Sequence, residues 1–410
     1  MEKDSFIPKN WAKRGNLITV IGVGGGGSNA VSYMFSQGIK DVDFIVCNTD
    51  CQALESSPVP KKLQLGVLTT KGLGAGTDYL VGRKAAQESI EDIEKIFNPD
   101  TEMAFVTCGM GGGTGTGAAP VVAKVAKEKG LLTVGVVTIP FRDEGIEALY
   151  RATEGIKELS KFVDSLLVID NQKLYSLYSD LDAFSAFPKA DDVLATAVKS
   201  IAEIITSRGF INVDFADVKK IMQNSGMAIM GIGSASGEDR ATKAVEAAFN
   251  SPLLNDLNLS NVKNALVNIT SSSEPGKAAK MSEVSTIMDY VKTYTGEMAN
   301  FKRGIVKNDA LGDSVSVTIV ATGFNLTELP VIDQESVSRG NRIEIRSSDT
   351  FKNRRRGLPL QSNGELTLTK ARVPGIPVML TADPETLSTL EKEPAYVRRD
   401  RMLNTPKETE

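Results

Sequence analysis

The sequence predicts an α/β fold, in which a domain with a parallel sheet is joined by a long central helix to a smaller mixed α/β domain with a disordered tail. Three observations lead to this prediction. Short apolar runs alternate with stretches of helical spacing through residues 16–190, which is typical of parallel sheets covered by helices. Residues 191–210 form one long amphipathic stretch, and apolar periodicity is lost after residue 325.

The first domain, residues 16–190, is expected to be a strand–loop–helix alternation. Each apolar, β-branched run is short enough for a buried strand and is followed by a glycine-rich or polar loop. The expected strands are residues 17–23, 44–47, 103–108, 131–139 and 166–169, and the expected helices are residues 28–36, 82–96 and 118–129. Strands that return through helices predict a parallel sheet with helices on both faces.

The central helix is predicted from Asp191 to Arg208, because Leu194, Val198 and Ile201 form one apolar stripe at helical spacing. The following domain, residues 211–325, is expected to be mixed α/β without a glycine-rich phosphate loop of its own. Its expected helices are residues 218–222, 239–250 and 282–294, and its expected strands are residues 264–269, 304–307 and 315–321.

The composition excludes several classes of protein. The 410-residue chain has no histidine, three cysteines and a formal charge of −4. A Ser-His-Asp or Cys-His enzyme is therefore excluded, and a structural zinc site is not expected. The negative charge argues against binding to nucleic acid. A polar start and the lack of an apolar run of membrane-spanning length predict a cytoplasmic protein, with no membrane insertion and with reduced thiols.

Two glycine runs each follow a predicted strand. The first, Gly22–Gly27, contains a match to the dinucleotide-binding pattern G-x-G-x-x-G, which alone is a weak signal. The second, Gly111–Gly117, reads Gly-Gly-Gly-Thr-Gly-Thr-Gly and precedes a predicted helix. Glycines let backbone N–H groups converge on an anion, and a helix directs the positive end of its dipole toward it. Two such runs at the carboxyl ends of strands in one sheet predict a phosphate-binding site.

Other nucleotide-binding classes fit less well. Neither run is followed by the Gly-Lys-Ser/Thr of a P-loop, so the lysine of Ras-like and ATPase sites is missing. A dinucleotide-dependent oxidoreductase stays open as an alternative, because Asp43 or Asp50 could provide the acidic residue that such sites need. That alternative leaves the second glycine run without a role.

Residues 16–325 resemble the tubulin/FtsZ family of GTPases. The segment Gly109–Pro120 is similar to the family's signature loop, and Gly22–Asn29 to its first phosphate loop. The resemblance implies a Rossmann-like GTPase domain that binds GTP and GDP. The residues that it assigns to the nucleotide are Gly24, Gly25, Gly26, Asn29, Asn48, Asp50, Gly74, Ala75, Gly76, Gly109, Gly111, Gly112, Gly113, Thr114, Gly115, Thr116, Gly117, Pro140, Glu144, Asn171, Phe187 and Asp191.

Within that set the resemblance distinguishes roles. Glu144 would contact the ribose, Phe187 would stack on guanine with Phe184 as a rival, and Asp191 would pair with the base. The chain also departs from the family pattern. Ala148 stands where an arginine is usual, with Arg142 and Arg151 as candidate substitutes, and Asn171 is followed by Gln172 rather than by aspartate.

The segment Asn212–Asp217 is similar to the family's catalytic loop. From the residues alone, Asp214 is equally well explained as a helix N-cap and Asp217 as a solvated first-turn residue. The resemblance instead implies that Asn212, Asp214 and Asp217 are catalytic and act on the nucleotide of the next subunit in a head-to-tail filament. Mg²⁺ would arrive with the nucleotide, and no protein side chain is assigned to a metal. A filament protein without hydrolysis is the third alternative, but it would be expected to lack this acidic pair.

The two ends of the chain are expected to lie outside the folded domains. Residues 1–15 are predicted to be a flexible segment, residues 326–390 a disordered linker, and residues 391–410 a partner-binding peptide. Residues 393–399, Glu-Pro-Ala-Tyr-Val-Arg-Arg, resemble the short peptide through which the family binds membrane-tethering and regulatory division proteins. The resemblance thus implies a role in the cytokinetic ring at the mid-cell division site of a bacterium.

Overall fold

A computed structural model describes residues 15–173, 183–206, 214–251, 262–295 and 300–324, with residues 183–191 and 300 described for their backbone only. The predicted flexible start, linker and C-terminal peptide lie outside these residues. Within them the chain forms a ten-stranded sheet in the order β3-β2-β1-β4-β5-β6-β7-β10-β8-β9. The predicted α/β class, with a mostly parallel sheet, is confirmed.

The first part of the sheet is parallel. β1 (Ile18–Val23) pairs with β2 (Val42–Asn48) on one side and with β4 (Met103–Gly109) on the other. β5 (Leu132–Ile139) and β6 (Ser165–Asp170) continue the order. The short strand β3 (Lys61–Gln64) was not predicted, because its exposed lysines give it no apolar pattern at the edge of the sheet.

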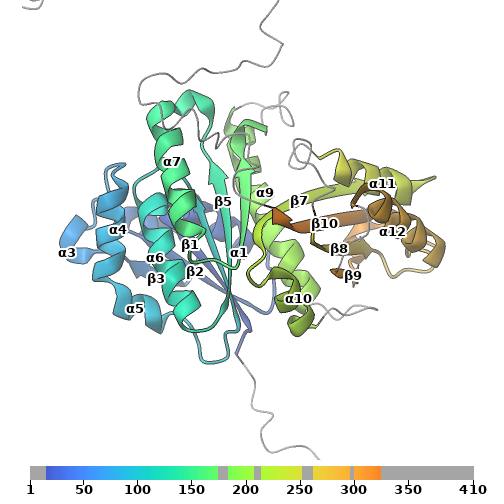
Figure 1. The fold of residues 1–410 in the computed structure, drawn as a ribbon, viewed down its shortest axis with the longest axis horizontal. Coiled ribbons are helices and arrows are strands. Elements are labelled where there is room, and N and C mark those ends of the chain that lie inside the picture. The colour runs from blue at the N-terminus through green and yellow to red at the C-terminus, as the bar shows by residue number, and fades with distance from the viewer. Residues whose placement is uncertain (1–14, 174–182, 207–213, 252–261, 296–299, 325–410) are drawn as a thin grey trace, which may run out of the picture. The chain divides into compact units, whose positions relative to one another are not determined.

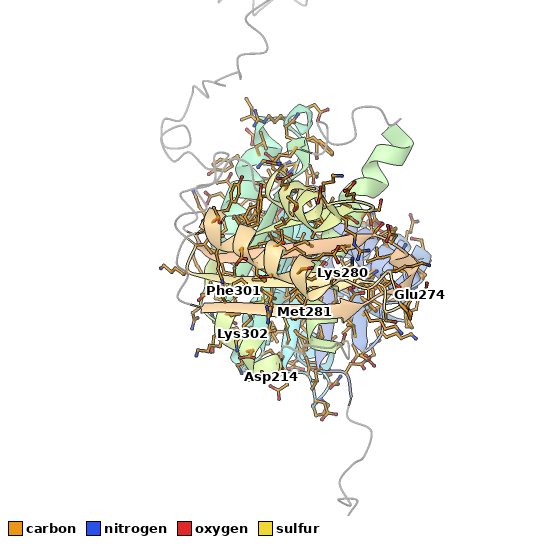
Figure 2. The ribbon with its side chains drawn as sticks, turned by 90° about the vertical axis from the view of Figure 1, so that its right-hand side faces the viewer. Asp214, Glu274, Lys280, Met281, Phe301 and Lys302 are labelled. Atoms are coloured by element: carbon orange, nitrogen blue, oxygen red, sulfur yellow. The ribbon has the colours of Figure 1, made fainter. Side chains whose placement is uncertain are left out.

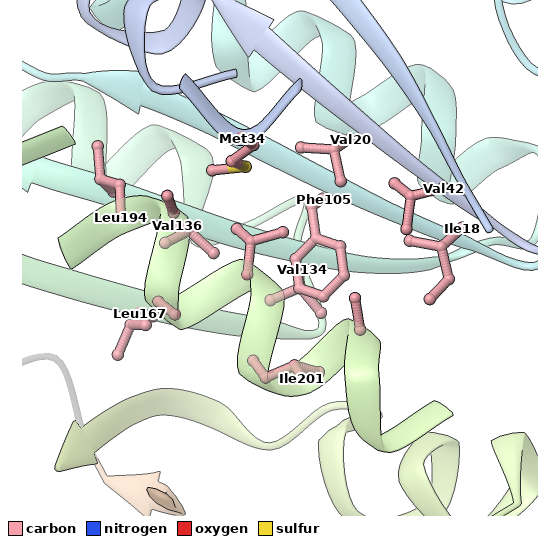
Figure 3. Close-up of a cluster of buried hydrophobic side chains, with 14 of the residues drawn as sticks. Ile18, Val20, Met34, Val42, Phe105, Val134, Val136, Leu167, Leu194 and Ile201 are labelled. Carbon is pink, nitrogen blue, oxygen red and sulfur yellow. The ribbon is translucent and has the colours of Figure 1, made fainter. Parts of the chain in front are cut away.

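Helices cover both faces of this parallel part (Figure 1). α1 (Gly24–Ser36), α9 (Ala183–Thr206) and α10 (Phe215–Met222) share one apolar cluster with the strands. Figure 3 shows part of this cluster. The other face packs against α4 (Tyr79–Glu88), α5 (Ile90–Lys95), α6 (Thr114–Glu128) and α7 (Ile146–Leu159). Ile18 and Val20 of β1 belong to the first cluster, whereas Ile21 and Val23 belong to the second. β1 is therefore buried on both faces, as its continuous apolar run predicts.

The second part of the sheet is mixed. β7 (Gly226–Ala235) and β8 (Asn264–Ser271) both pair antiparallel with β10 (Val315–Phe324), and β9 (Asn300–Lys307) pairs parallel with β8. α11 (Arg240–Phe249) and α12 (Met281–Thr295) share an apolar cluster with β8 and β10. β7 was not predicted, because glycines interrupt its apolar pattern.

The two parts belong to one continuous sheet. Ser165, Leu166 and Leu167 of β6 pair parallel with Gly226, Met227 and Ala228 of β7. The predicted division into a domain of residues 16–190 and a domain of residues 211–325 stays a prediction. In the structure, the hydrogen-bonded ladder between β6 and β7 connects these two ranges.

Several helix boundaries differ from the prediction. Helices were expected from Ser28 and Ala118, but α1 begins at Gly24 and α6 at Thr114, so the glycine runs form first turns of helices. Glycine costs about 1 kcal/mol in a helix, but a Cβ on Gly27 would overlap the Thr107 carbonyl, so close packing requires it. The stretch expected as one helix over residues 82–96 is two, because the chain breaks at Ser89.

Short elements complete the first part. α2 (Cys51–Ser56) and α3 (Val67–Thr70) lie between β2 and α4, and two 3₁₀ turns span Arg142–Glu144 and Asp309–Leu311. α7 and the early start of α9 at Ala183 were not predicted. None of the helices in the described part of the chain combines the length and the apolar character that crossing a bilayer requires.

Candidate nucleotide site

A pocket of about 450 Å³ lies at the carboxyl ends of β1, β4, β5 and β6. This volume is within the range of small-molecule sites. Its lining residues are Gly25, Gly26, Asn29, Gly109, Met110, Gly112, Gly113, Thr114, Gly115, Thr138, Pro140, Phe141, Glu144, Asn171 and Leu194. The fold therefore brings together both glycine runs, the Pro140–Glu144 loop and Asn171, which are far apart in sequence. Met110, Thr138, Phe141 and Leu194 were missed, because each also fits an ordinary strand, loop or core position.

Two helices start at this pocket without a capping side chain. Val23 and Gly113 are the N-caps of α1 and α6, neither provides a side-chain hydrogen bond, and neither first turn holds an acidic residue. The first N–H groups of a helix have no partner within it, and they carry the positive end of its dipole. By contrast, Asp50 and Asp78 cap α2 and α4 with their carboxylates. Two uncapped helix starts facing one cavity form a site for an anion such as phosphate.

The predicted residues outside the pocket lining support the loops. Asn48 is buried, and its Oδ1 accepts hydrogen bonds from the N–H groups of Thr49 and Asp50, at 2.8 and 3.3 Å. The Thr49 hydroxyl lies 2.6 Å from that of Thr114 at the start of α6. The loop containing Gly74, Ala75 and Gly76 packs nearby, since Gly74 N–H donates to the Thr49 carbonyl. Thr49 had not been predicted, and it links the β2 loop to the phosphate loop.

Close packing explains two further predicted residues. Gly24 begins α1 with φ of +73°, and a Cβ there would lie 2.7 Å from the Gly115 nitrogen, so the two glycine runs touch through their backbones. A Cβ on Gly117 would overlap the Tyr79 carbonyl oxygen, so Gly117 lets α4 approach α6. Gly117 contributes to helix packing beside the pocket rather than to its wall.

Gly111 is held from both sides. Its φ of +99° is one that glycine adopts readily. Its N–H donates to the Thr116 hydroxyl at 2.9 Å, and its carbonyl accepts from Arg151 Nε at 2.7 Å. Because C=O and N–H point in opposite directions across a trans peptide, Arg151 turns the Gly112 N–H away from α7. Gly112 lines the pocket, so this contact favours an N–H group directed at a bound anion.

Arg151 is also the candidate substitute that contacts the phosphate loop. Ala148, in the position of the usual arginine, is 6% exposed and lies one helical turn before Arg151. The backbone N–H of the other candidate, Arg142, donates to Gln172 Oε1 at 3.1 Å, and the residue is exposed. Between the two candidates left open by the sequence, the geometry favours Arg151.

The opposite side of the pocket carries groups suited to a nucleoside. Asn171 Oδ1 is buried and has no hydrogen-bond partner among the described residues, which is unusual for a polar atom unless a ligand or water satisfies it. Glu144 Oε1 accepts from the Phe141 N–H at 2.8 Å. Phe184, Phe187 and Asp191 lie on α9, but their side chains are outside the described residues.

The acidic pair lies elsewhere. Asp214 is the N-cap of α10, and its Oδ1 accepts from the Asp217 N–H at 2.8 Å. Asp217 is not a simply solvated residue, because its Oδ1 lies 2.6 Å from Lys302 Nζ on β9. Asn212 is outside the described residues. Lys302 was missed, because nothing local links a lysine to a helix 85 positions earlier.

The acidic pair and the pocket lie at opposite edges of the sheet: the pocket lies at the edge where the parallel strands end, and the acidic pair lies at the edge where they begin. Directly after α10, Ser225 N–H donates to the carbonyl of Asp164, the residue before β6, at 2.8 Å. Lys302 is near the start of β9, which is parallel to β8. Because β7 and β8 are both antiparallel to β10, and β7 is parallel to β6, β9 begins at the same edge as β6. Asn171, in contrast, follows the end of β6. Figure 1 shows α10 at the lower edge of the view. At about 3.3 Å per residue, the six-residue strand separates the two edges by roughly 20 Å.

Two of the three cysteines are buried. Cys47 and Cys108 are free thiols, and burial raises the pKa of each to about 12. A thiol with so high a pKa stays protonated and is a poor nucleophile. Cys51 is also free and half-buried.

The fold and pocket define a class: a nucleotide-binding α/β protein whose phosphate site is built from helix starts and glycine backbone, without a P-loop lysine. Family models identify the class more closely. Residues 17–179 match the "Tubulin/FtsZ family, GTPase domain" and residues 226–325 match the "FtsZ family, C-terminal domain".

Individual relatives agree with the family models. The cell division protein FtsZ of Pseudomonas aeruginosa is 48% identical over 327 residues, which is 79% of this chain and 82% of that protein. The FtsZ of Porphyromonas gingivalis is 40% identical over 98% of this chain and 90% of its own length. A solved FtsZ dimer from M. jannaschii superposes with a TM-score of 0.71 at 40% identity, covering 77% of this chain and 89% of its own. CetZ2 of Haloferax volcanii, at 22% identity and a TM-score of 0.64, shares the fold over 74% of this chain and 92% of its own.

The chain therefore belongs to the FtsZ family of tubulin-like GTPases. It is a cell-division protein that binds GTP and GDP, hydrolyses GTP and self-associates into filaments. The oxidoreductase alternative and the filament protein without hydrolysis are both set aside by this membership.

Proposed function

We propose that each GTP is hydrolysed between two subunits, with the pocket of one completed by Asn212, Asp214 and Asp217 of the next. The observation that supports this most is the separation of two half-sites, the nucleotide pocket and the acidic pair Asp214 and Asp217. One chain places its pocket and α10 at opposite edges of the same sheet, roughly 20 Å apart. A chain's own carboxylates therefore cannot reach its own pocket, whereas those of a neighbour stacked head to tail can. A repeated contact of this kind that does not close yields a filament.

The pocket supplies binding and charge stabilisation. Uncapped N–H groups of α1 and α6 surround the phosphates, and Gly112 N–H is oriented by the Arg151 contact. Positioning and electrostatic stabilisation are the main requirements of phosphoryl transfer. The neighbour's Asp217 and Asp214 then orient the attacking water in line with the bond to the leaving group. Asn212 is assigned to the same loop by resemblance.

Mg²⁺ is proposed to accompany the nucleotide. In the described ranges no three acidic or thiol side chains gather as a metal site, and Mg²⁺ commonly binds through substrate phosphates and water. The pocket fits such an ion because the described residues of its wall include the hydroxyl of Thr114 and neither lysine nor arginine. When bound, the ion would neutralise part of the phosphate charge.

Recognition of guanine is assigned to the Asn171 side of the pocket. Its buried, unpartnered Oδ1 is an acceptor for a ligand N–H group, and Phe187 and Asp191 are proposed to stack on and pair with the base. Asn171→Leu keeps a similar volume and removes the acceptor. We expect it to weaken GTP binding about tenfold, since an unmade hydrogen bond to a buried group costs about 1–3 kcal/mol. Equal GTP affinity in both chains would contradict this role.

Residues 391–410 are proposed to bind membrane-tethering and regulatory division proteins, with residues 393–399 as the core of the contact at mid-cell in the cytoplasm. A chain truncated after residue 390 should polymerise normally with GTP and fail to bind a purified tether in a pull-down. Retained tether binding by the truncated chain would refute this assignment.

The shared site is tested by Asp217→Ala. We expect GTP binding to be unchanged at low protein concentration, and turnover to fall by at least 100-fold at concentrations where filaments form. In the native chain, turnover per subunit should rise steeply above a threshold concentration, because an isolated subunit has no complete site. A native rate per subunit that is independent of concentration would contradict sharing, and unchanged turnover in the variant would remove Asp217 from the mechanism.

A further inference from the structure

The pocket wall lacks a cationic side chain. Among the described residues that line it there is no lysine or arginine, and its one ionisable group is the carboxylate of Glu144. The proposed function brings two more carboxylates, Asp214 and Asp217, toward a triphosphate. Such an arrangement accumulates negative charge where phosphoryl transfer needs it compensated.

A compensating cation is already attached to the incoming half-site. Lys302 Nζ lies 2.6 Å from Asp217 Oδ1, which is the distance of a charge-assisted hydrogen bond. Asp217 N–H in turn donates to Asp214, so the three residues form one connected group. Figure 2 shows Lys302 and Asp214 on the same face of the molecule. A subunit that delivers Asp217 to its neighbour must deliver Lys302 with it.

The fold fixes where Lys302 emerges. It pairs in register with Leu266 of β8, and Leu266 belongs to the apolar cluster that contains Val218 and Ile221 of α10. Lys302 therefore leaves the sheet on the face that α10 covers. The side chains of Lys302 and Asp217 are 43% and 31% exposed, so the pair is open to an approaching subunit.

We propose that Lys302 is a positioning residue of the shared GTPase site: it holds the Asp217 carboxylate and offsets the negative charge that this carboxylate brings to the neighbour's phosphates. This inference rests on the proposed sharing of the site. The competing explanation is an ordinary surface ion pair, which contributes little to either stability or activity.

The test compares Lys302→Ala and Lys302→Arg with Lys292→Ala. Lys292 is also a surface lysine paired with an aspartate, Asp289, at 3.8 Å, but on α12. GTPase activity is measured well above the assembly threshold, filaments are quantified by sedimentation, and nucleotide affinity is measured at low protein concentration. We expect Lys302→Ala to lower kcat per assembled subunit at least tenfold with unchanged nucleotide affinity. Lys302→Arg should restore most of the rate, and Lys292→Ala should match the native chain.

Two results would overturn the proposal: Lys302→Ala turning over at the rate of Lys292→Ala, or Lys302→Arg being as slow as Lys302→Ala. Asp217→Ala distinguishes a failure of the proposed lysine role from a failure of the shared site. If Asp217→Ala is inactive while Lys302→Ala is normal, the lysine role alone fails. If Asp217→Ala is active, the shared site itself fails.

Discussion

The starts of α1 and α6 and the start of α10 are built in opposite ways. α1 and α6 begin on glycine backbone with neither a capping side chain nor an acidic residue in the first turn. α10 begins with Asp214 as its N-cap and carries Asp217 in its first turn. A helix start attracts anions. At α1 and α6 a ligand can provide the anion, whereas at α10 the carboxylates of the helix itself provide it. The difference gives each subunit one edge that binds anions and another that presents them.

The largest effect is expected when a carboxylate is placed beside the start of α6, where the native chain has none. A Cβ at Gly112 meets no atom within 4 Å, so an alanine methyl fits there, and Gly112→Asp adds a carboxylate beyond the same Cβ. At an effective dielectric of about 20, two unit charges about 5 Å apart repel by about 3 kcal/mol. Gly112→Asp should therefore weaken GTP binding by more than about 100-fold in a titration, whereas Gly112→Ala should change it by less than about threefold. Equal affinities for the two variants would show that charge does not govern the site.

A smaller effect is expected when the loop peptide is released from α7. In Arg151→Ala the Gly111 carbonyl loses its donor, and the peptide that carries the Gly112 N–H loses this restraint. A hydrogen bond involving a charged group is worth about 1.5–3 kcal/mol, so GDP affinity should fall roughly tenfold. Lys157→Ala, on the same helix and paired with Glu154, is the matched control and should bind normally. An Arg151→Ala chain that binds GDP like the control would leave the loop orientation to other contacts.

The smallest expected effect concerns stability at the acidic helix start. Asp214→Ala removes the cap of α10 and should lower the free energy of unfolding by about 1 kcal/mol. Asp214→Asn keeps a capping oxygen without the charge and should unfold like the native chain in denaturant, while GTPase activity falls in both variants. Normal activity in Asp214→Asn would reduce Asp214 to a structural cap.

The parallel sheet and the two glycine runs could be predicted from local signals, whereas Asn29, Pro140, Glu144 and Asn171 of the pocket wall were assigned through the resemblance to the family. Continuous apolar runs mark strands buried on both faces, and the glycine runs mark close backbone approach. Helix starts were placed four residues late for α1 and α6, since glycine propensity argues against helix and the packing that overrides it is not local. β7 was not predicted for a similar reason. Its glycines interrupt the apolar pattern, and the pairing with β10 that forms the strand is not local in sequence.

Contacts between distant side chains could not be predicted. Lys302 looks like any exposed lysine on an edge strand, and its pairing with Asp217 follows from the register of β9 and the position of α10. The choice of Arg151 over Arg142 likewise depends on how α7 packs beside Gly111. The role of Asp214 as a cap was open from the sequence, and the hydrogen bond that its carboxylate accepts from Asp217 N–H shows that it caps α10.

The continuous ladder from β6 to β7 determines how many complete active sites a filament contains. It joins both half-sites within one sheet, so a subunit always contributes one pocket and one acidic pair in opposite directions. A filament of any length then contains one complete site fewer than it has subunits. One terminal subunit keeps a pocket that no neighbour completes, and the other keeps an acidic pair with no phosphate to act on. The two ends are chemically different, and the nucleotide in the uncompleted terminal pocket is hydrolysed only after another subunit adds to that end.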